Sequence, residues 1–544
     1  MDAQAARRSL KPFLLAMVIA WMMAVSPTAN AAKPGTLVAI GGGPEDPALM
    51  LDVLAVANGT NSRVVVLNTA SGDPARSGPV YARFFRSLGV SDVTVLPLLD
   101  QDDAYRETNL GSLLKADLIY VTGGNQIKLV RAIANTPAHG AILAAFQRGA
   151  VVAGTSAGAM VWGPRFLAGG SSEAAWRSDD TGKTAAVALQ DGLELVHEVL
   201  VDTHFAREGR IGRLLAACSF KGSAVTADRL IGVGIDEGTA AVLTHDQLRV
   251  FGKGRVTVLD PKEARIVVKD ARLQAARDVT MHILGRGESL RWRRDEREKL
   301  PLLTQSTWER PRLLGTWLQG GTEGFVTQSR CQAEILAQAP DDTLIVAPDA
   351  LAAAARQWQG LLQARPTATA RVLLASQLSS PLLARYLPRV DGLIVLEDRQ
   401  GGLVRALNTE FATLLKQHAS HLRLLAIGPA VTLIGESNMQ QGGEGAALFS
   451  GLRLIPGIIP SANLWAPGAF DRLTLDALLA GGATAIGLVP DGGVAIDPQG
   501  IRAGGISPTL IIDTSQVSMA NPSLPSARDL KLHVLPPGER FTWR

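Results

Sequence analysis

Short apolar runs alternate with longer stretches of helical periodicity along the first half of the chain. The runs fall at residues 36–40, 63–69, 92–96, 117–122 and 150–153. Because strands that are buried on both faces of a parallel sheet are apolar throughout, this pattern predicts a sheet covered by helices on both sides. We therefore expect an α/β fold whose strands are mainly parallel.

Glycine and polar residues follow several of these runs. Residues 41–43 are three glycines after the first run, residues 123–126 follow the fourth, and Ser156 follows the fifth. In open parallel sheets ligands bind outside the carboxyl ends of the strands, so we expect these segments to meet at one edge. The glycine run has neither the G-x-G-x-x-G spacing nor a Gly-Lys-Ser/Thr sequence, and it does not predict a nucleotide site.

The segment Gly154-Thr-Ser-Ala-Gly158 has the G-x-S-x-G pattern of a nucleophile elbow, a sharp turn between a strand and a helix. A side chain at either glycine would crowd the neighbouring strand or helix, and the serine backbone itself is strained. Such a turn raises the Ser156 hydroxyl above the sheet and directs the Ala157 N–H toward a developing oxyanion. Close-packed turns also show this pattern, so alone it does not establish a hydrolase.

Two later segments end in side chains suited to acid–base chemistry. Residues 200–205 predict a strand that ends near His204, and residues 230–237 predict a strand that ends on two carboxylates. Between the elbow and these strands, residues 164–183 have no regular pattern and predict a functional lid or an insertion.

Composition excludes several classes of protein. The chain has 544 residues, of which 47% are hydrophobic and 19% charged, as in globular domains. A formal net charge of +4 and the lack of a basic stripe with aromatics argue against a nucleic-acid partner. We expect Cys218 and Cys331 to be two buried thiols, with a disulfide as the alternative. No Cys/His cluster has metal-ligand spacing, so we expect no metal.

Residues 1–31 have the three parts of a secretory signal peptide. Arg7 and Arg8 form the basic start, residues 13–25 are apolar, and residues 29–31 have small side chains at a cleavage site. The apolar run is too short to span a bilayer. We therefore expect export to the periplasm or beyond, through the twin-arginine or the general route, and no membrane contact after cleavage.

Four segments together resemble the sequence blocks of the cyanophycinase family of serine peptidases. They are residues 123–126, 154–158, 202–213 and 234–239, in that family's order and at comparable spacing. The resemblance covers about residues 33–270. It implies a class I glutamine-amidotransferase-like, flavodoxin-like α/β fold with a Ser–His–acid triad, and peptidase activity without a cofactor.

Carried over to this chain, the resemblance implies Ser156 as nucleophile, His204 as general base and Glu237 as the acid that orients the imidazole. Serine is a weak nucleophile until a base takes its proton, and the imidazole must be held in one tautomer. Asp202 and Asp236 are rival acids. An extended segment would turn Asp202 away from His204.

The resemblance also implies an oxyanion hole and a substrate site. The N–H groups of Gly124 and Asn125 would share the oxyanion with Ala157. The family's contacts to a β-aspartyl-arginine unit fall on Gln126, Asp202, Thr203, Arg210 and Arg213. Two positions depart from the family pattern, because Thr203 stands where glutamine is expected and Glu208 where arginine is expected. These departures put specificity for cyanophycin in question, and a solvated helix face is the other interpretation of the charges after His204.

The second half of the chain repeats the first. Residues 117–133 align without a gap to residues 391–407, with seven identities in seventeen positions. When this alignment is continued, Ser156, His204 and Glu237 fall on Gly428, Asn463 and Gly492. The second copy therefore lacks the triad.

A charge run and flanking prolines at residues 286–311 predict a linker. It separates a catalytic domain at 33–285 from a degenerate, non-catalytic domain at 312–544. From elbow to histidine the first copy has 48 residues (156 to 204) and the second has 35 (428 to 463). The second copy thus lacks about the length of the lid. We expect it to take the place of a partner subunit in an intramolecular pseudo-dimer.

These observations predict an exported serine peptidase that cleaves an aspartyl or β-aspartyl amide through an acyl-enzyme. Its partner would be a peptide or an aspartate-backbone polymer. An aspartyl or isoaspartyl dipeptidase of the same superfamily is the alternative enzyme and would favour short peptides. A non-enzymatic peptide-binding protein is the third interpretation, and the intact Ser–His–Glu set argues against it.

Overall fold

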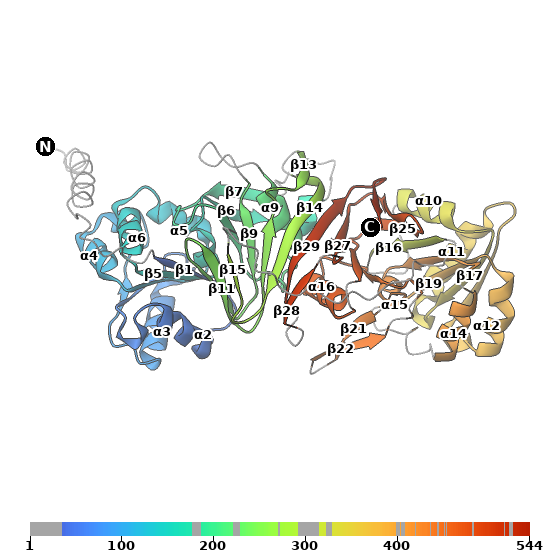
Figure 1. The fold of residues 1–544 in the computed structure, drawn as a ribbon, viewed down its shortest axis with the longest axis horizontal. Helices are drawn as coiled ribbons and strands as arrows, with labels where there is room; N and C mark the ends of the chain where they lie inside the picture. Colours follow the sequence, from blue (N-terminus) through green and yellow to red (C-terminus); the bar gives the residue numbers. More distant parts are fainter. Residues whose placement is uncertain are drawn as a thin grey trace.

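The computed structural model describes residues 35–543 with internal gaps. The molecule is elongated, with the first half of the chain at one end and the second half at the other (Figure 1). The gaps are residues 177–186, 221–228, 270–271, 292–314, 322–328, 399–402, 404–408, 419, 436, 443–444, 451, 453, 481–482, 516 and 522–525. The predicted signal peptide lies outside the described residues. Within the described part, no helix has the length and apolar character needed to cross a membrane.

The first sheet confirms the parallel strands that the apolar runs predict. Its eight strands have the order β15-β11-β10-β1-β5-β4-β2-β3. The parallel strands are β1 (Thr36–Ile40), β2 (Val64–Leu67), β3 (Val93–Leu96), β4 (Leu118–Val121) and β5 (Val151–Thr155). The antiparallel strands are β10 (Thr239–Leu243), β11 (Gln247–Gly252) and β15 (Ser289–Arg291). Strand β15 lies within the range predicted as linker, so the first sheet extends beyond residue 285.

Helices cover both faces of this sheet. They are α2 (Pro47–Val56), α3 (Pro74–Ser87), α4 (Glu107–Lys115), α5 (Gln126–Ile133) and α6 (Pro137–Gln147). Aspartates cap the N-termini of two of them. The Asp46 carboxylate accepts from the Ala48 N–H at α2, and the Asp73 carboxylate accepts from the Arg76 N–H at α3. Helices α2 and α3 pack on one face and α4 to α6 on the other, which gives the sheet an apolar core on each side.

A second sheet runs through both halves of the chain. Its order is β23-β24-β27-β29-β14-β12-β9-β8. The first half supplies β8 (Val199–Asp202), β9 (Ile231–Ile235), β12 (Val256–Asp260) and β14 (Arg272–Leu284). The second half supplies β23 (Ile458–Ser461), β24 (Thr484–Gly487), β27 (Thr509–Asp513) and β29 (Ser526–Leu535). The antiparallel pair β14–β29 joins the halves at the middle of the molecule (Figure 1).

The third sheet repeats the topology of the first, which confirms that the chain holds two copies of one fold. Its order is β18-β17-β19-β20-β16-β25-β26-β30, the same path as in the first sheet. The strands are β16 (Gly315–Gln319), β17 (Asp342–Ala347), β18 (Thr369–Leu374), β19 (Gly392–Leu396), β20 (Arg423–Ile427), β25 (Gly492–Asp497), β26 (Gly500–Gly505) and β30 (Arg540–Thr542). The helices of this half include α10 (Ser329–Gln338), α11 (Ala352–Gln363), α12 (Ser380–Tyr386), α14 (Thr409–His418), α15 (Ala430–Leu433) and α16 (Ala469–Leu479).

The junction between the copies is reciprocal. Asp278 on β14 and Asp529 on β29 both have positive φ, 60° and 64°. The Asp278 N–H lies 3.2 Å from Nδ1 of His533, and the Asp529 N–H lies 3.2 Å from Nδ1 of His282. One apolar cluster, which includes Met281 and Leu532, spans both copies. The two halves therefore share a core and behave as one folded unit at this junction.

The segment after the elbow is more regular than the sequence predicts. It forms a hairpin of β6 (Arg165–Gly170) and β7 (Val187–Asp191), with the short helix α8 (Ser172–Trp176) after β6. Residues 177–186 of the predicted lid lie outside the described residues. The second copy keeps a hairpin here, β21 (Ser437–Gly442) with β22 (Gly445–Ser450). The prediction of irregular structure was wrong because apolar and polar residues alternate only weakly in this glycine-rich, half-exposed hairpin, so its strands have no clear sequence pattern.

The expected replacement of Glu237 by Gly492 was also wrong. Gly234 of β9 and Gly487 of β24 hold the same register position in their sheets. Counting on from these glycines, Glu237 corresponds to Pro490. Proline carries no carboxylate, so the second copy still lacks the acid.

Both cysteines are buried free thiols, as expected. Burial raises the pKa of Cys218 to about 12 and that of Cys331 to about 11.

Candidate active site

The nucleophile elbow has the geometry that its glycines predict. Ser156 stands between β5 and the short helix α7 (Ala157–Met160), with φ 52° and ψ −123°. Its N–H donates to the carbonyl oxygen of Ile40 at 3.0 Å, which ties the turn to β1. A Cβ at Gly154 would lie 2.1 Å from the carbonyl oxygen of Gly158. The turn therefore requires glycine there and holds the serine in a strained conformation.

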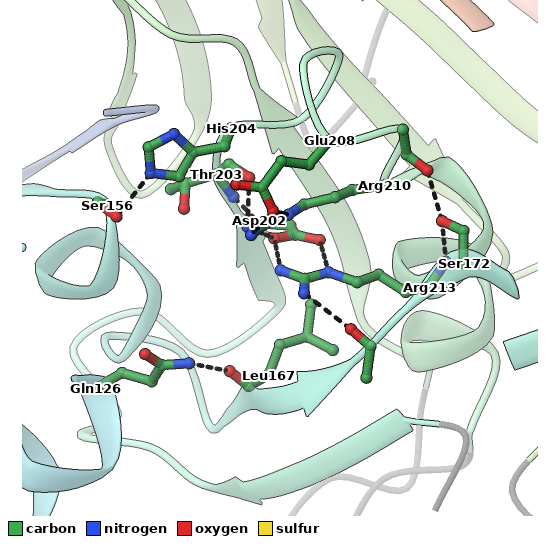
Figure 2. A network of polar contacts seen from close by, with 12 residues as sticks. Gln126, Ser156, Leu167, Ser172, Asp202, Thr203, His204, Glu208, Arg210 and Arg213 are labelled. Carbon is green, nitrogen blue, oxygen red and sulfur yellow. Dashed lines mark hydrogen bonds and ion pairs between the residues drawn. The ribbon is translucent and has the colours of Figure 1, made fainter. Parts of the chain in front are cut away.

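Ser156, His204 and Glu237 form one continuous hydrogen-bonded set. The Ser156 Oγ lies 2.8 Å from Nε2 of His204, a contact drawn in Figure 2. The other ring nitrogen, Nδ1, lies 2.6 Å from Oε1 of Glu237. An ionised carboxylate can only accept a hydrogen bond, so this contact requires the tautomer with the proton on Nδ1, which leaves Nε2 free to accept the serine proton. His204 and Glu237 are about one-fifth exposed, at 22% and 21%, so the set opens to solvent.

The glycine run after β1 supports this set. The His204 N–H donates to the carbonyl oxygen of Gly41 at 2.8 Å. Gly42 has φ 92°, and a Cβ there would lie 2.3 Å from Cε1 of the His204 ring. Sequence reasoning placed this run at the sheet edge but did not assign its role. The run lets the backbone pass directly beneath the imidazole.

Arg207 is a site residue that sequence reasoning missed. Its Nη1 donates to both carboxylate oxygens of Glu237, at 2.9 and 2.8 Å. Burial alone would raise the pKa of Glu237, but the hydrogen bonds from His204 and Arg207 and the charge of Arg207 lower it. The guanidinium thus keeps the Glu237 carboxylate ionised. In the sequence, the only signal for this contact is that Arg207 follows His204 by three residues.

Arg207→Gln is expected to move the acid limb of the pH–rate profile to higher pH by less than about one unit. Without the guanidinium, the full charge of Glu237 faces the imidazole, so the inactive imidazolium form persists to higher pH. The shift is small because the Arg207 side chain is 69% exposed and acts through solvent. Rates of hydrolysis measured across the pH range check this. Arg207→Lys is the matched control, and an equal shift in both variants would contradict a charge effect.

The expected oxyanion hole needs one correction. The Asn125 N–H donates to the carbonyl oxygen of Ala70 at 2.8 Å, so it is committed to the backbone. The Asn125 side chain caps α5 by accepting from the N–H groups of Ile127 and Lys128. The N–H groups of Gly124 and Ala157 remain as the expected donors. Asn125 was misassigned because sequence alone does not show which backbone donors are already paired.

Asp202 is not the acid paired with His204 but anchors a separate polar cluster next to the triad, drawn in Figure 2. The carboxylate is fully buried and accepts from the Thr203 N–H at 2.9 Å. Arg213 donates to it from Nε at 2.7 Å and from Nη2 at 2.5 Å, and Arg210 donates from Nη1 at 3.1 Å. Arg213 also donates to the carbonyl oxygen of Gly170 at 3.0 Å. The acceptor sites of Asp202 are filled by protein donors, and the Asp202–Arg213 pair links β8, the hairpin and helix α9 (Ile211–Ser219).

The other expected substrate residues surround this cluster. Glu208 pairs with the Arg210 guanidinium, whose Nη1 also donates to the Thr203 carbonyl at 2.6 Å. The Thr203 hydroxyl is buried and has no hydrogen-bond partner among the described residues. Gln126, at the start of α5, donates from Nε2 to the carbonyl oxygen of Leu167 at 3.0 Å. Two acids and two arginines therefore form a self-neutralising group beside the triad.

The first half of the chain is similar to known peptidases. Residues 37–251 match the model of the family described as Peptidase family S51. A cyanophycinase of Trichormus variabilis is 35% identical over 242 residues, which are 43% of this chain and 76% of the relative. A cyanophycinase of Geminocystis herdmanii is 34% identical over 244 residues, 43% of this chain and 83% of the relative. A cyanophycinase of Synechococcus elongatus is 37% identical over 236 residues, 42% of this chain and 69% of the relative. The chain therefore belongs to peptidase family S51, and its catalytic half is a serine-type peptidase of the cyanophycinase family.

Proposed function

We propose that this protein is an exported peptidase that hydrolyses an aspartyl or β-aspartyl amide through a Ser156 acyl-enzyme. The observation that carries the proposal is the pair of contacts from Ser156 through His204 to Glu237, at 2.8 and 2.6 Å. Export rests on the signal-like residues 1–31, from which the mature chain would begin near Ala32.

The geometry supports a two-step reaction. As Oγ of Ser156 attacks the amide carbonyl carbon, its proton passes to Nε2 of His204, and Glu237 stabilises the imidazolium. The N–H groups of Gly124 and Ala157 would stabilise the oxyanion. The C–N bond then breaks as Nε2 returns the proton to the leaving nitrogen. Water hydrolyses the resulting ester by the same route, giving its proton to Nε2, and Oγ leaves as the hydroxyl.

Residues beside the triad bear on the choice of substrate. The cyanophycinase relatives favour a polymer with β-aspartyl-arginine units, whereas Thr203 and Glu208 depart from that pattern. In addition, Glu208 is already paired with Arg210, so a substrate guanidinium must compete with that arginine. Mass-spectrometric product analysis with β-Asp-Arg polymer and with aspartyl and isoaspartyl dipeptides distinguishes the cyanophycinase from the dipeptidase. No cleavage of any of these would favour the binding-protein interpretation.

Restoring the family pattern with Thr203→Gln and Glu208→Arg is expected to raise cleavage of the β-Asp-Arg polymer by about tenfold. The change removes the Glu208 carboxylate, which pairs with Arg210, and places a glutamine amide at position 203, next to the catalytic base. The gain or loss of one such contact changes the relative rates of related substrates by about this factor. Initial rates on the polymer measure the effect. Glu208→Gln is the control, since it removes the charge and adds no guanidinium. Unchanged or slower cleavage in the double variant would indicate a different natural substrate.

A further inference from the structure

A segment of the non-catalytic copy lies directly against the backbone that follows the catalytic histidine. The Gly468 N–H donates to the carbonyl oxygen of Ala206 at 2.8 Å, two residues after His204. Gly468 is the residue before α16, a helix near the middle of the molecule (Figure 1) that packs against β23 and β24. The two copies therefore meet beside the active site as well as at the β14–β29 junction.

Trp465 fixes the position of this segment. Its ring is edge-on to Trp176 of α8, with centroids 4.9 Å apart and planes at 84°. It also covers Gly212 of α9, where a Cβ would lie 2.8 Å from the ring. The Trp176 Nε1–H donates to the Gly212 carbonyl at 3.2 Å. The contact is thus aromatic, partly buried and tied to the helix that carries Arg213.

A pair of carboxyl groups completes the contact. Asp236, which precedes Glu237 in the chain, accepts from the Ala206 N–H with Oδ1 and from the Arg255 N–H with Oδ2, each at 3.1 Å. Its carboxyl group also hydrogen-bonds that of Asp471, on the first turn of α16. A hydrogen bond between two carboxyl groups requires one proton. Asp236 already accepts from two backbone donors, so the proton resides on Asp471.

We propose that Asp471, supplied by the non-catalytic copy, is a positioning residue for the triad. It holds Asp236 in place, and Asp236 in turn fixes Ala206, between His204 and Arg207, as well as the backbone next to Glu237. This proposal rests on the function proposed above. It gives the second copy a direct role at a site that it does not itself contain.

The proton on Asp471 makes this positioning sensitive to pH. Burial and the charge of Asp236 raise the pKa of Asp471 to about 7, while Arg255 and Arg472 oppose the shift. Burial likewise raises the pKa of Asp236, against the hydrogen bonds from Arg255 and Ala206. A raised pKa in the folded state means that the contribution is complete at acid pH and is lost as pH rises through about 7. Above that pH two carboxylates face each other and repel.

The test compares Asp471→Asn with Asp471→Ala in the full chain. The readout is the rate at which a fluorophosphonate probe labels Ser156 between pH 5 and 9. An asparagine amide donates to Asp236 at every pH, so Asp471→Asn should retain the wild-type rate at pH 6 and lack the decline above about pH 7. Asp471→Ala should label about tenfold more slowly at pH 6, because the donor is gone. Asp349→Asn, an exposed carboxylate of the same copy, should have the wild-type profile.

The outcomes separate the two proposals. If the probe does not label Ser156 in the wild-type chain, the serine-peptidase mechanism itself fails. If labelling is normal but Asp471→Asn has the same pH profile as the wild type, the positioning role is overturned and the mechanism stands. Thermal unfolding at pH 6 checks that both variants are folded, and an Asp471→Ala variant that is folded and labels at the wild-type rate also overturns the role.

Discussion

Replacing Ser156 with alanine is expected to lower the rate of amide hydrolysis by about 10⁴-fold or more, because triad members act as a unit. The fold should be unaffected, since among the described residues the Ser156 side chain makes one hydrogen bond, to His204, and the turn is set by backbone contacts and glycines. The measurement is the turnover of the purified variant on whichever aspartyl substrate the wild type cleaves. A far-ultraviolet circular dichroism spectrum like that of the wild type verifies folding.

Two controls belong to this experiment. An active-site serine probe should label the wild-type chain once, at Ser156, because the second copy has Gly428 at the corresponding turn, with φ 62°. A chelator should leave the wild-type rate unchanged, since the proposed steps use only Ser156, His204, Glu237 and backbone donors. Substantial turnover by the alanine variant would contradict the mechanism.

A fragment of residues 33–300 is expected to form a homodimer or to precipitate, whereas the full chain stays a monomer. Removing the second half exposes the edge of β14 and uncovers an apolar surface that includes Val279, Met281 and Ile283, which are nearly or fully buried in the whole chain. An unpaired strand edge with buried apolar side chains pairs readily with another copy. We propose on this ground that the second copy takes the place of a partner subunit.

Light scattering of the fragment and of the full chain at several concentrations measures this effect. A Met281→Lys variant of the fragment is the matched control, because a charge on the exposed face of β14 should reduce self-association. A fragment that is monomeric and fully active would show that the second copy is a separate module, and its contacts at Ala206 would then be dispensable for catalysis.

The sequence predicted those parts of the fold and site that depend on local signals. The apolar runs located the parallel strands. The glycines around Ser156 located the elbow, because a turn this sharp has no room for a Cβ and therefore requires glycine at fixed positions. His204 and Glu237 were predicted from the four segments that resemble the family's sequence blocks. Asn125 was misassigned because its N–H is paired with a residue 55 positions earlier (125 − 70), which no local pattern reveals.

Contacts between the copies were beyond sequence reasoning for the same physical reason. The pairing of β14 with β29 and the contact of Asp471 with Asp236 join segments more than 200 residues apart. Long-range pairs of this kind leave no periodicity in either segment. The repeat itself was predicted, but the shift from Gly492 to Pro490 shows that internal alignment loses register where one copy has replaced a polar loop by an apolar one.

The reciprocal junction at His282 and His533 has a consequence for behaviour on dilution. An assembly of two separate subunits dissociates when its concentration falls below the dissociation constant, whereas two halves of one chain keep a high effective concentration at any dilution. The β14–β29 contact therefore persists, and with it the Gly468 contact to Ala206, however few molecules are present. The specific activity of this peptidase should accordingly be independent of enzyme concentration down to the lowest level at which it can be assayed.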